Sequence, residues 1–178
     1  MVGKAERNTK RTDAEIAPLP LDLENYVTAI LTWITHKLSK DASSIYEQLY
    51  GISISEWRVI SYLAVKQRGT GSEISEFQGL DKGAISRSIA TLRKRKIVLA
   101  DRPNGRKIAL RLSVKGIGIY NKVVLTALAR EEVLLEGFAP DERKLIIDLL
   151  QRLHGNIPRV IQFGIDLIKR HNSTLAQF

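Results

Sequence analysis

Apolar residues recur every three or four positions along much of this chain, a spacing that predicts amphipathic helices. The first such run extends from Leu21 to Gly51, where the glycine is expected to end the helix. Its apolar face consists of Leu23, Tyr26, Val27, Ile30, Ile34, Leu38, Ile45 and Leu49. One long helix is therefore predicted ahead of all other elements.

Two shorter helices follow, and each begins with a capping box. Ser53 and Glu56 stand at the start of one, and Thr70 and Glu73 at the start of the next, which is expected to end at Gly79. In a capping box the hydroxyl accepts a hydrogen bond from the backbone three residues on, and the glutamate bonds back to the first residue. The sequence therefore specifies both helix starts locally.

A fourth helix is predicted over residues 82–96, with Asp81 as its N-cap. One face is apolar and consists of Ile85, Ile89 and Leu92. The other faces carry the side chains of Lys82, Ser86, Arg87, Ser88, Thr91, Arg93, Lys94 and Arg95. A helix that is apolar on one side and rich in hydrogen-bonding groups on the other is suited to read a DNA groove.

Two β-prone runs, 97–100 and 107–112, flank an Asn104-Gly105 pair, which is a strong hairpin signal. Two successive helices followed by a basic hairpin predict a winged helix-turn-helix. Beyond it, Ser113 is expected to cap a helix that runs to about Glu136. A last helix should begin at Pro140 and break at Pro158, near residue 156.

The helices after the hairpin contain more apolar residues than a small winged lobe could cover. These are Ile117, Val123, Val124, Leu128, Val133, Leu134, Leu135, Leu145, Ile146, Leu149, Leu150 and Leu153. A helix that is apolar over much of its circumference must be buried somewhere. A second copy of the chain and a separate monomeric helical domain are the two alternatives.

The positive charge of the chain is concentrated in one segment. Residues 82–115 contain eleven Lys and Arg against a single acid, Asp101, a local charge of +10 in a chain of net charge +9. Each Lys or Arg placed against a phosphate releases a condensed counterion, so the segment suits a polyanion. A solvated helix face is the simpler alternative, but the order of predicted elements favours nucleic acid.

Composition excludes several other classes. The chain has no Cys and only three scattered histidines, so neither a disulfide framework nor a metal site is expected, and no cofactor. No apolar run approaches the ~20 residues that cross a bilayer, and we expect a cytoplasmic protein. Gly116-Ile-Gly118 lacks the third glycine of a dinucleotide turn, since Asn121 stands there. With no hydrolase motif or phosphate loop either, the chain is not expected to be an enzyme.

Three stretches together resemble the MarR family of bacterial transcription regulators. They are Gly51-Ile-Ser-Ile-Ser-Glu-Trp57-Arg-Val-Ile60, Lys82-Gly-Ala-Ile-Ser86-Arg87, and Asn104-Gly105-Arg106 with Leu112-Ser-Val-Lys-Gly116. The likeness covers about residues 21–159 and rests on the order and spacing of these stretches. Three departures stand out: a short wing, Asn104 where the family commonly has an acid, and Lys96 where a glycine usually follows the recognition helix.

The resemblance implies a mainly α fold with a winged helix-turn-helix lobe, a small β-hairpin wing and an α-helical dimerisation region from both termini. The lobe would span residues 51–113 and the dimerisation region residues 21–50 and 114–172. Separately, the basic and polar composition at the start of the chain predicts that residues 1–20 are a disordered basic tail. A homodimer of this kind binds a pseudo-palindromic operator in double-stranded DNA, with half-sites about 10 bp apart. Repression, relieved by a small aromatic ligand, is the expected function. A regulator or architectural protein without an effector is the alternative, and a winged-helix protein-docking module a third.

Roles follow for individual residues. On the recognition helix, Ser86 and Arg87, flanked by Lys82 and Thr91, are expected to meet base edges or nearby phosphates. Arg87 is the best candidate for a bidentate guanine contact, with a phosphate clamp or an intramolecular ion pair as the alternative. In the wing, Arg106 resembles the arginine that enters the minor groove, and Arg102 and Lys107 are expected to serve phosphates. Arg93, Lys94 and Arg95 are interpreted as a solvated cluster that suits the helix dipole.

Two tryptophans bear on ligand binding. Trp57 lies at the family's core tryptophan position and is predicted to pack in the core. Trp33 and His36, three residues apart on the first helix, could stack on and hydrogen-bond to a small aromatic acid. A dimer-interface Trp and an exposed His are the alternative, and Arg58 and Tyr26 are weaker ligand candidates.

Overall fold

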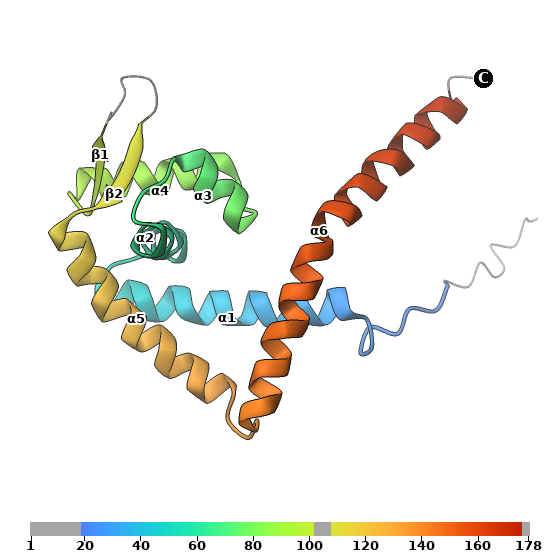
Figure 1. The fold of residues 1–178 in the computed structure, drawn as a ribbon, viewed down its shortest axis with the longest axis horizontal. Coiled ribbons are helices and arrows are strands. Elements are labelled where there is room, and N and C mark those ends of the chain that lie inside the picture. Colours follow the sequence, from blue (N-terminus) through green and yellow to red (C-terminus); the bar gives the residue numbers. More distant parts are fainter. Residues whose placement is uncertain (1–18, 102–107, 176–178) are drawn as a thin grey trace, which may run out of the picture. The chain divides into compact units, whose positions relative to one another are not determined.

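The structure of the chain, a computed structural model, describes residues 19–101 and 108–175 (Figure 1). Within these ranges it contains six helices and two strands. In chain order they are α1 (Val27–Tyr50), α2 (Ile54–Lys66), α3 (Gly71–Gln78), α4 (Lys82–Lys94), β1 (Val98–Asp101), β2 (Ala109–Leu112), α5 (Val114–Leu134) and α6 (Pro140–Leu175). The described residues divide into two compact units, the first ending at Tyr120 and the second beginning at Asn121. The predicted mainly α fold with a hairpin wing is confirmed.

The predicted capping boxes are present at both helix starts. At α2 the Ser53 hydroxyl accepts from the Glu56 N–H at 3.2 Å, and the Ser53 N–H donates to the Glu56 carboxylate at 2.9 Å. The same exchange joins Thr70 and Glu73 at the start of α3: the Thr70 hydroxyl accepts from the Glu73 N–H at 3.2 Å, and the Thr70 N–H donates to the Glu73 carboxylate at 2.7 Å. At α4 the Asp81 carboxylate accepts from the Ala84 N–H at 2.8 Å. These contacts span three residues, which is why the sequence alone could predict them.

The first helix begins six residues later than predicted, at Val27 instead of Leu21. The cause is an Asx-type turn: the Asp22 carboxylate accepts from the backbone N–H groups of Glu24 and Asn25 and from the Asn25 side-chain amide. These hydrogen bonds from Asn25 also lower the pKa of the Asp22 carboxyl. A side chain that bonds its own neighbouring backbone competes with helix formation. Two of the expected apolar positions, Leu23 and Tyr26, therefore precede the helix.

The wing is an antiparallel pair in which Val98 faces Leu112 and Asp101 faces Ala109. Leu110 also bridges Gly69 on the α2–α3 connection through two backbone hydrogen bonds of 2.8 and 3.1 Å. The base of the wing is thus tied to the helical part of the lobe. The tip, with the predicted Asn104-Gly105 turn, lies outside the described residues.

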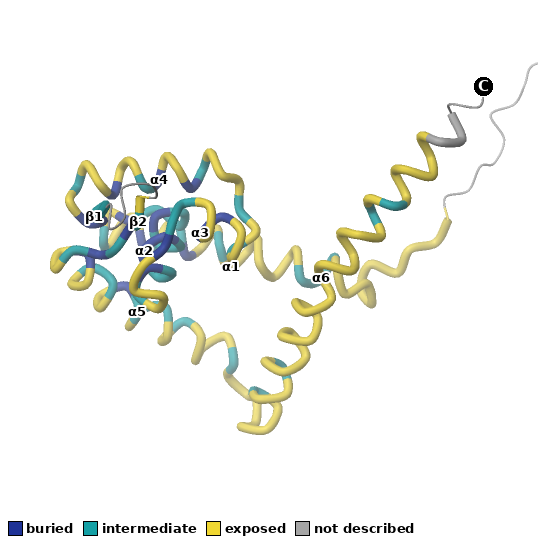
Figure 2. The backbone as a smooth tube through the Cα atoms, turned by 45° about the horizontal axis from the view of Figure 1, so that its top comes forward, coloured by how far each residue is buried: buried dark blue, intermediate teal, exposed yellow. Residues whose placement is uncertain are grey.

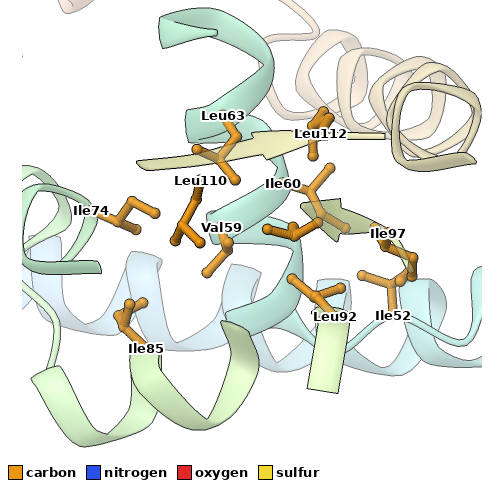
Figure 3. Packing of buried hydrophobic residues seen from close by; sticks show 11 residues of the cluster. Ile52, Val59, Ile60, Leu63, Ile74, Ile85, Leu92, Ile97, Leu110 and Leu112 are labelled. Carbon is orange, nitrogen blue, oxygen red and sulfur yellow. The ribbon is translucent and has the colours of Figure 1, made fainter. Parts of the chain in front are cut away.

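Eleven side chains from α2, α3, α4, the wing and the segments beside them form the core of the first unit (Figure 3). They are Ile52, Val59, Ile60, Leu63, Ile74, Ile85, Leu92, Ile97, Val98, Leu110 and Leu112. Trp57 packs against this cluster, stacked on Tyr120 with ring centroids 5.7 Å apart and edge-on to Tyr46 at 5.8 Å. The prediction that Trp57 serves core packing is confirmed.

The second unit consists of the later part of α5 and the long helix α6. The turn between these helices is held by Arg143, which pairs with Glu132 at 2.7 Å and donates to the Leu135 carbonyl at 3.0 Å. The predicted break at Pro158 is wrong, because α6 continues through it to Leu175. A proline removes one intrahelical hydrogen bond and permits a kink. The apolar stripe of Leu153, Ile157 and Ile161 keeps its helical spacing across the proline, which favours continuation.

Candidate nucleic-acid interface

Helix α4 divides sharply into a buried and an exposed face. Ile85 and Leu92 are buried in the core of the lobe. The four residues of this helix that are predicted to meet DNA are all exposed: Lys82, Ser86, Arg87 and Thr91. Ser88 does not belong with them: it is buried, and its hydroxyl donates to the Ala84 carbonyl at 3.1 Å. Satisfying its hydroxyl within its own helix allows this small polar residue to lie inward.

Arg87 extends toward the start of its helix. A Cβ atom built on Gly83 would lie 3.3 Å from Arg87 Nη1 and 3.1 Å from Asp81 Oδ1, so the guanidinium lies over the first turn. In helix-turn-helix proteins the first residues of the recognition helix contact base edges. The predicted base-reading side chain is therefore at the appropriate end of α4.

A hollow of about 260 Å³ lies between α3 and α4. It is lined by Gly71 and Ser72 from α3 and by Lys82, Ser86 and Ile89 from α4. Two of the predicted DNA-contacting residues thus share one concave surface with the apolar side chain of Ile89. Such a surface offers both hydrogen-bonding groups and an apolar contact, as base edges require.

The residues at the end of α4 have defined hydrogen-bond partners, unlike a solvated basic cluster. Lys96 has a φ of 59°, the left-handed conformation for which glycine is better suited. The left-handed backbone accounts for the glycine that the resemblance places at this position. In this chain Lys96 is a strained replacement for it. The Ser113 hydroxyl donates to the Lys96 carbonyl at 2.7 Å, and the Lys115 ammonium to the Arg95 carbonyl at 3.1 Å.

Arg95 was expected to be solvated with its neighbours, and that expectation is wrong. Its Nη1 donates to the Gly51 carbonyl at 2.8 Å and lies 3.5 Å from the buried carboxylate of Glu56. Arg93 and Lys94 are exposed, as predicted. The partners of Arg95 are about forty residues away in sequence, so helical periodicity gave no signal for the contact.

Within the wing, Arg111 pairs with Asp101 across the two strands at 2.6 Å. The single acid of the basic segment therefore has an assigned partner within the lobe. The three predicted wing contacts, Arg102, Arg106 and Lys107, lie outside the described residues.

The two ligand candidates, Trp33 and His36, are both exposed on α1. Trp33 is 42% exposed, which is high for a large aromatic side chain. Of the weaker candidates, Arg58 donates to the Ser39 hydroxyl at 3.3 Å, and Tyr26 is exposed.

Within residues 19–101 and 108–175 no group of three or more acidic, His or Cys side chains is arranged to hold a metal ion. In the same ranges, none of the helices has the length and apolar character needed to cross a membrane.

The helix-turn-helix of α3 and α4, followed by a hairpin whose second strand bridges back to Gly69, defines a winged helix-turn-helix protein. Comparison with solved structures supports the same class of protein. The chain is 30% identical to a MarR/EmrR family transcriptional regulator from Acinetobacter sp. ADP1, covering 78% of this chain and 99% of that one with a TM-score of 0.73. This chain belongs to the MarR family of transcriptional regulators.

Two more distant neighbours share the fold. The MepR–DNA complex of S. aureus is 16% identical over 75% of this chain and 98% of that one, with a TM-score of 0.66. PcaV from Streptomyces coelicolor, in complex with its natural ligand, is 18% identical over 78% of this chain and 98% of that one, with a TM-score of 0.63. No family model and no curated protein sequence matches the chain.

Proposed function

We propose that this chain acts as a homodimeric transcription regulator that binds a pseudo-palindromic operator in double-stranded DNA. The observation that carries the proposal is the exposed face of α4, where Lys82, Ser86, Arg87 and Thr91 stand opposite the buried side chains of Ile85 and Leu92. A helix held in this way can enter a major groove without unfolding any part of the core. The assignment of Arg102, Arg106 and Lys107 to the wing contacts remains part of this proposal.

Salt dependence tests the DNA-binding part directly. If each protomer neutralises several phosphates, affinity for duplex DNA should fall about 10³-fold or more between 50 and 200 mM salt. The purified full chain would be titrated with a fluorescent duplex at four salt concentrations. A flat titration would contradict nucleic-acid binding and favour a winged-helix protein-docking module.

Dimerisation is supported by the apolar surface of α6 and by the exposed first half of α1, where Val27, Trp33 and Ile34 are each more than 40% exposed. Symmetric dimers with two winged lobes suit operators whose half-sites are about one helical turn apart. Footprinting on the DNA upstream of the chain's own gene would reveal two protected half-sites. One isolated half-site would argue for a monomer.

We further propose that the regulator represses and is released by a small aromatic acid near Trp33 and His36. An aromatic surface and a nearby donor suit a ring with a carboxylate. A ligand can release DNA only by the difference in its affinity for the two states, typically about 1–3 kcal/mol. The neighbour PcaV was solved with its natural ligand, which supports a search for an effector here.

A panel of aromatic acids would be screened by tryptophan fluorescence and then by release of operator DNA. Trp33→Ala and His36→Ala should weaken the response, while Trp57→Phe, a change in the packed tryptophan, should leave it intact. Ligands that bind the free and DNA-bound protein equally well would instead favour the alternative, a regulator or architectural protein without an effector. We propose no catalytic role.

A further inference from the structure

The side chain of Arg95, just after the last turn of α4, bridges to the junction between α1 and α2. Its Nη1 donates to the Gly51 carbonyl at 2.8 Å and lies 3.5 Å from Glu56 Oε1. The Glu56 side chain is 9% exposed and the Arg95 side chain 34%. Arg95 is therefore a basic residue of α4's C-terminal end whose guanidinium is engaged by partners within the protein.

Both partners of Arg95 are themselves fixed. Gly51 is the left-handed residue that ends α1, and its N–H donates to the Glu47 carbonyl at 2.9 Å. Glu56 uses its other oxygen in the capping box that begins α2. One guanidinium thus joins the end of α1 and the start of α2 to the end of α4.

The backbone of Arg95 is held as well. Its N–H donates to the Thr91 carbonyl at 3.0 Å, and its carbonyl accepts from the Lys115 ammonium at 3.1 Å. Arg87 lies eight residues earlier, about 12 Å along the helix at 1.5 Å per residue. A small rotation of α4 at its fixed end would therefore shift the base-contacting residues at the other end.

We propose that Arg95 is a positioning residue for DNA recognition: by clamping the end of α4 to Gly51 and Glu56, it sets the orientation in which Ser86 and Arg87 enter the groove. The inference rests on the proposed DNA-binding function. It assigns to Arg95 a role in sequence preference without a contact to a base or a phosphate. A phosphate contact by the same side chain is the competing account.

Removing the charge of Glu56 should change operator affinity in opposite directions under the two explanations. If Arg95 acts on DNA only through its positive charge, Glu56→Gln removes a nearby negative charge and should strengthen binding to DNA. If the clamp orients α4, the same change weakens the ion pair and should weaken operator binding. Gln can replace Glu in a capping box, so the start of α2 is preserved.

The experiment uses the purified full chain and two duplexes of equal length. One is an operator selected by this chain from a random-sequence pool, and the other is a scrambled version of it. Arg95→Ala, Glu56→Gln and the parent would be titrated at several salt concentrations, with circular dichroism as the check of folding. Arg93→Ala, which removes an exposed cation two residues away, is the matched control.

We expect Arg95→Ala to lower operator affinity about tenfold, within the range for loss of a base contact, with the scrambled duplex and the salt slope almost unchanged. Glu56→Gln should shift operator affinity in the same direction, and Arg93→Ala should retain the preference for the operator. Equal losses on both duplexes with a salt slope lowered by about one per lost phosphate contact would make Arg95 a phosphate ligand.

Unchanged or tighter operator binding by Glu56→Gln would also overturn the proposal, and this variant decides alone if Arg95→Ala does not fold. Failure of the proposed function has a different signature, since the parent itself would then show no salt-dependent binding to either duplex.

Discussion

The winged lobe buries many of its apolar residues, whereas helix α6 leaves most of its apolar residues exposed. In the lobe, ten of the eleven core side chains are at most 3% exposed. In α6, twelve large apolar residues from Leu145 to Ile168 are 41–65% exposed, as the nearly continuous exposed colour of this helix shows (Figure 2). Exposed apolar surface of this extent marks an interaction site. The core of the lobe is buried within one chain, whereas the apolar residues of α6 form the surface that the proposed dimer would bury.

The largest effect is expected from a charge placed on that α6 surface. Leu153→Asp puts a carboxylate in the middle of the stripe formed by Leu149, Leu153 and Ile157. Burying an unpaired charge costs several kcal/mol, so the dimer should dissociate at least about 100-fold more readily. Sedimentation measured over a range of protein concentrations would show it.

Gln151→Asp is the matched control, because it adds the same charge on a different face of the same helix. It should leave the dimer intact. If Leu153→Asp sediments like the parent, the exposed stripe of α6 is not the dimer interface, and the contrast with the lobe loses its explanation.

A smaller effect is expected within the lobe's own packing, from Gly116→Ala. A Cβ at Gly116 would lie 2.3 Å from the Ile97 carbonyl oxygen, a backbone atom that cannot move freely. We expect a loss of about 2–3 kcal/mol in the free energy of unfolding, measured by urea titration.

Gly118 supplies the control two residues later on the same helix, since a Cβ there would meet nothing within 4 Å. Gly118→Ala should stabilise the protein by about 0.5–1 kcal/mol through helix propensity. Equal effects of the two substitutions would contradict the close packing of α5 against Ile97.

The smallest effect concerns the strained end of the recognition helix. Lys96 has a left-handed φ of 59°, which is strained for a residue with a side chain. Lys96→Gly removes this strain and should raise the free energy of unfolding by about 0.5–1 kcal/mol. Arg93→Gly removes one cation as well but lies inside α4, so it should destabilise by a similar amount. Thermal unfolding would resolve the opposite signs. A loss of stability in Lys96→Gly would mean that its backbone is not strained.

Features encoded by residues close in sequence were predictable. The capping boxes at Ser53 and Thr70, the Asp81 cap and the buried positions of Ile85 and Leu92 follow from spacings of three or four residues. The β-prone runs on either side of the Asn104-Gly105 pair also located the wing strands to within a residue or two at the ends that the structure describes.

Features that depend on distant residues were not predictable in this way. Nothing local to Arg95 indicates Glu56, and nothing local to Gly116 indicates the Ile97 carbonyl. The inward orientation of Ser88 follows from a hydrogen bond that a polarity pattern treats as a surface feature. At Pro158 the local signal predicted a helix break that does not occur, because the apolar stripe that continues past the proline outweighs that signal.

Arg87→Ala tests the central claim, that α4 reads DNA sequence, most directly. The variant and the parent would be titrated against the selected operator and against its single-base variants, with Arg93→Ala as the control. We predict that Arg87→Ala loses about 1–3 kcal/mol on the operator and relaxes the preference at particular base pairs, while Arg93→Ala keeps the full preference. An Arg87→Ala protein that discriminates among the operator variants as the parent does would contradict the claim.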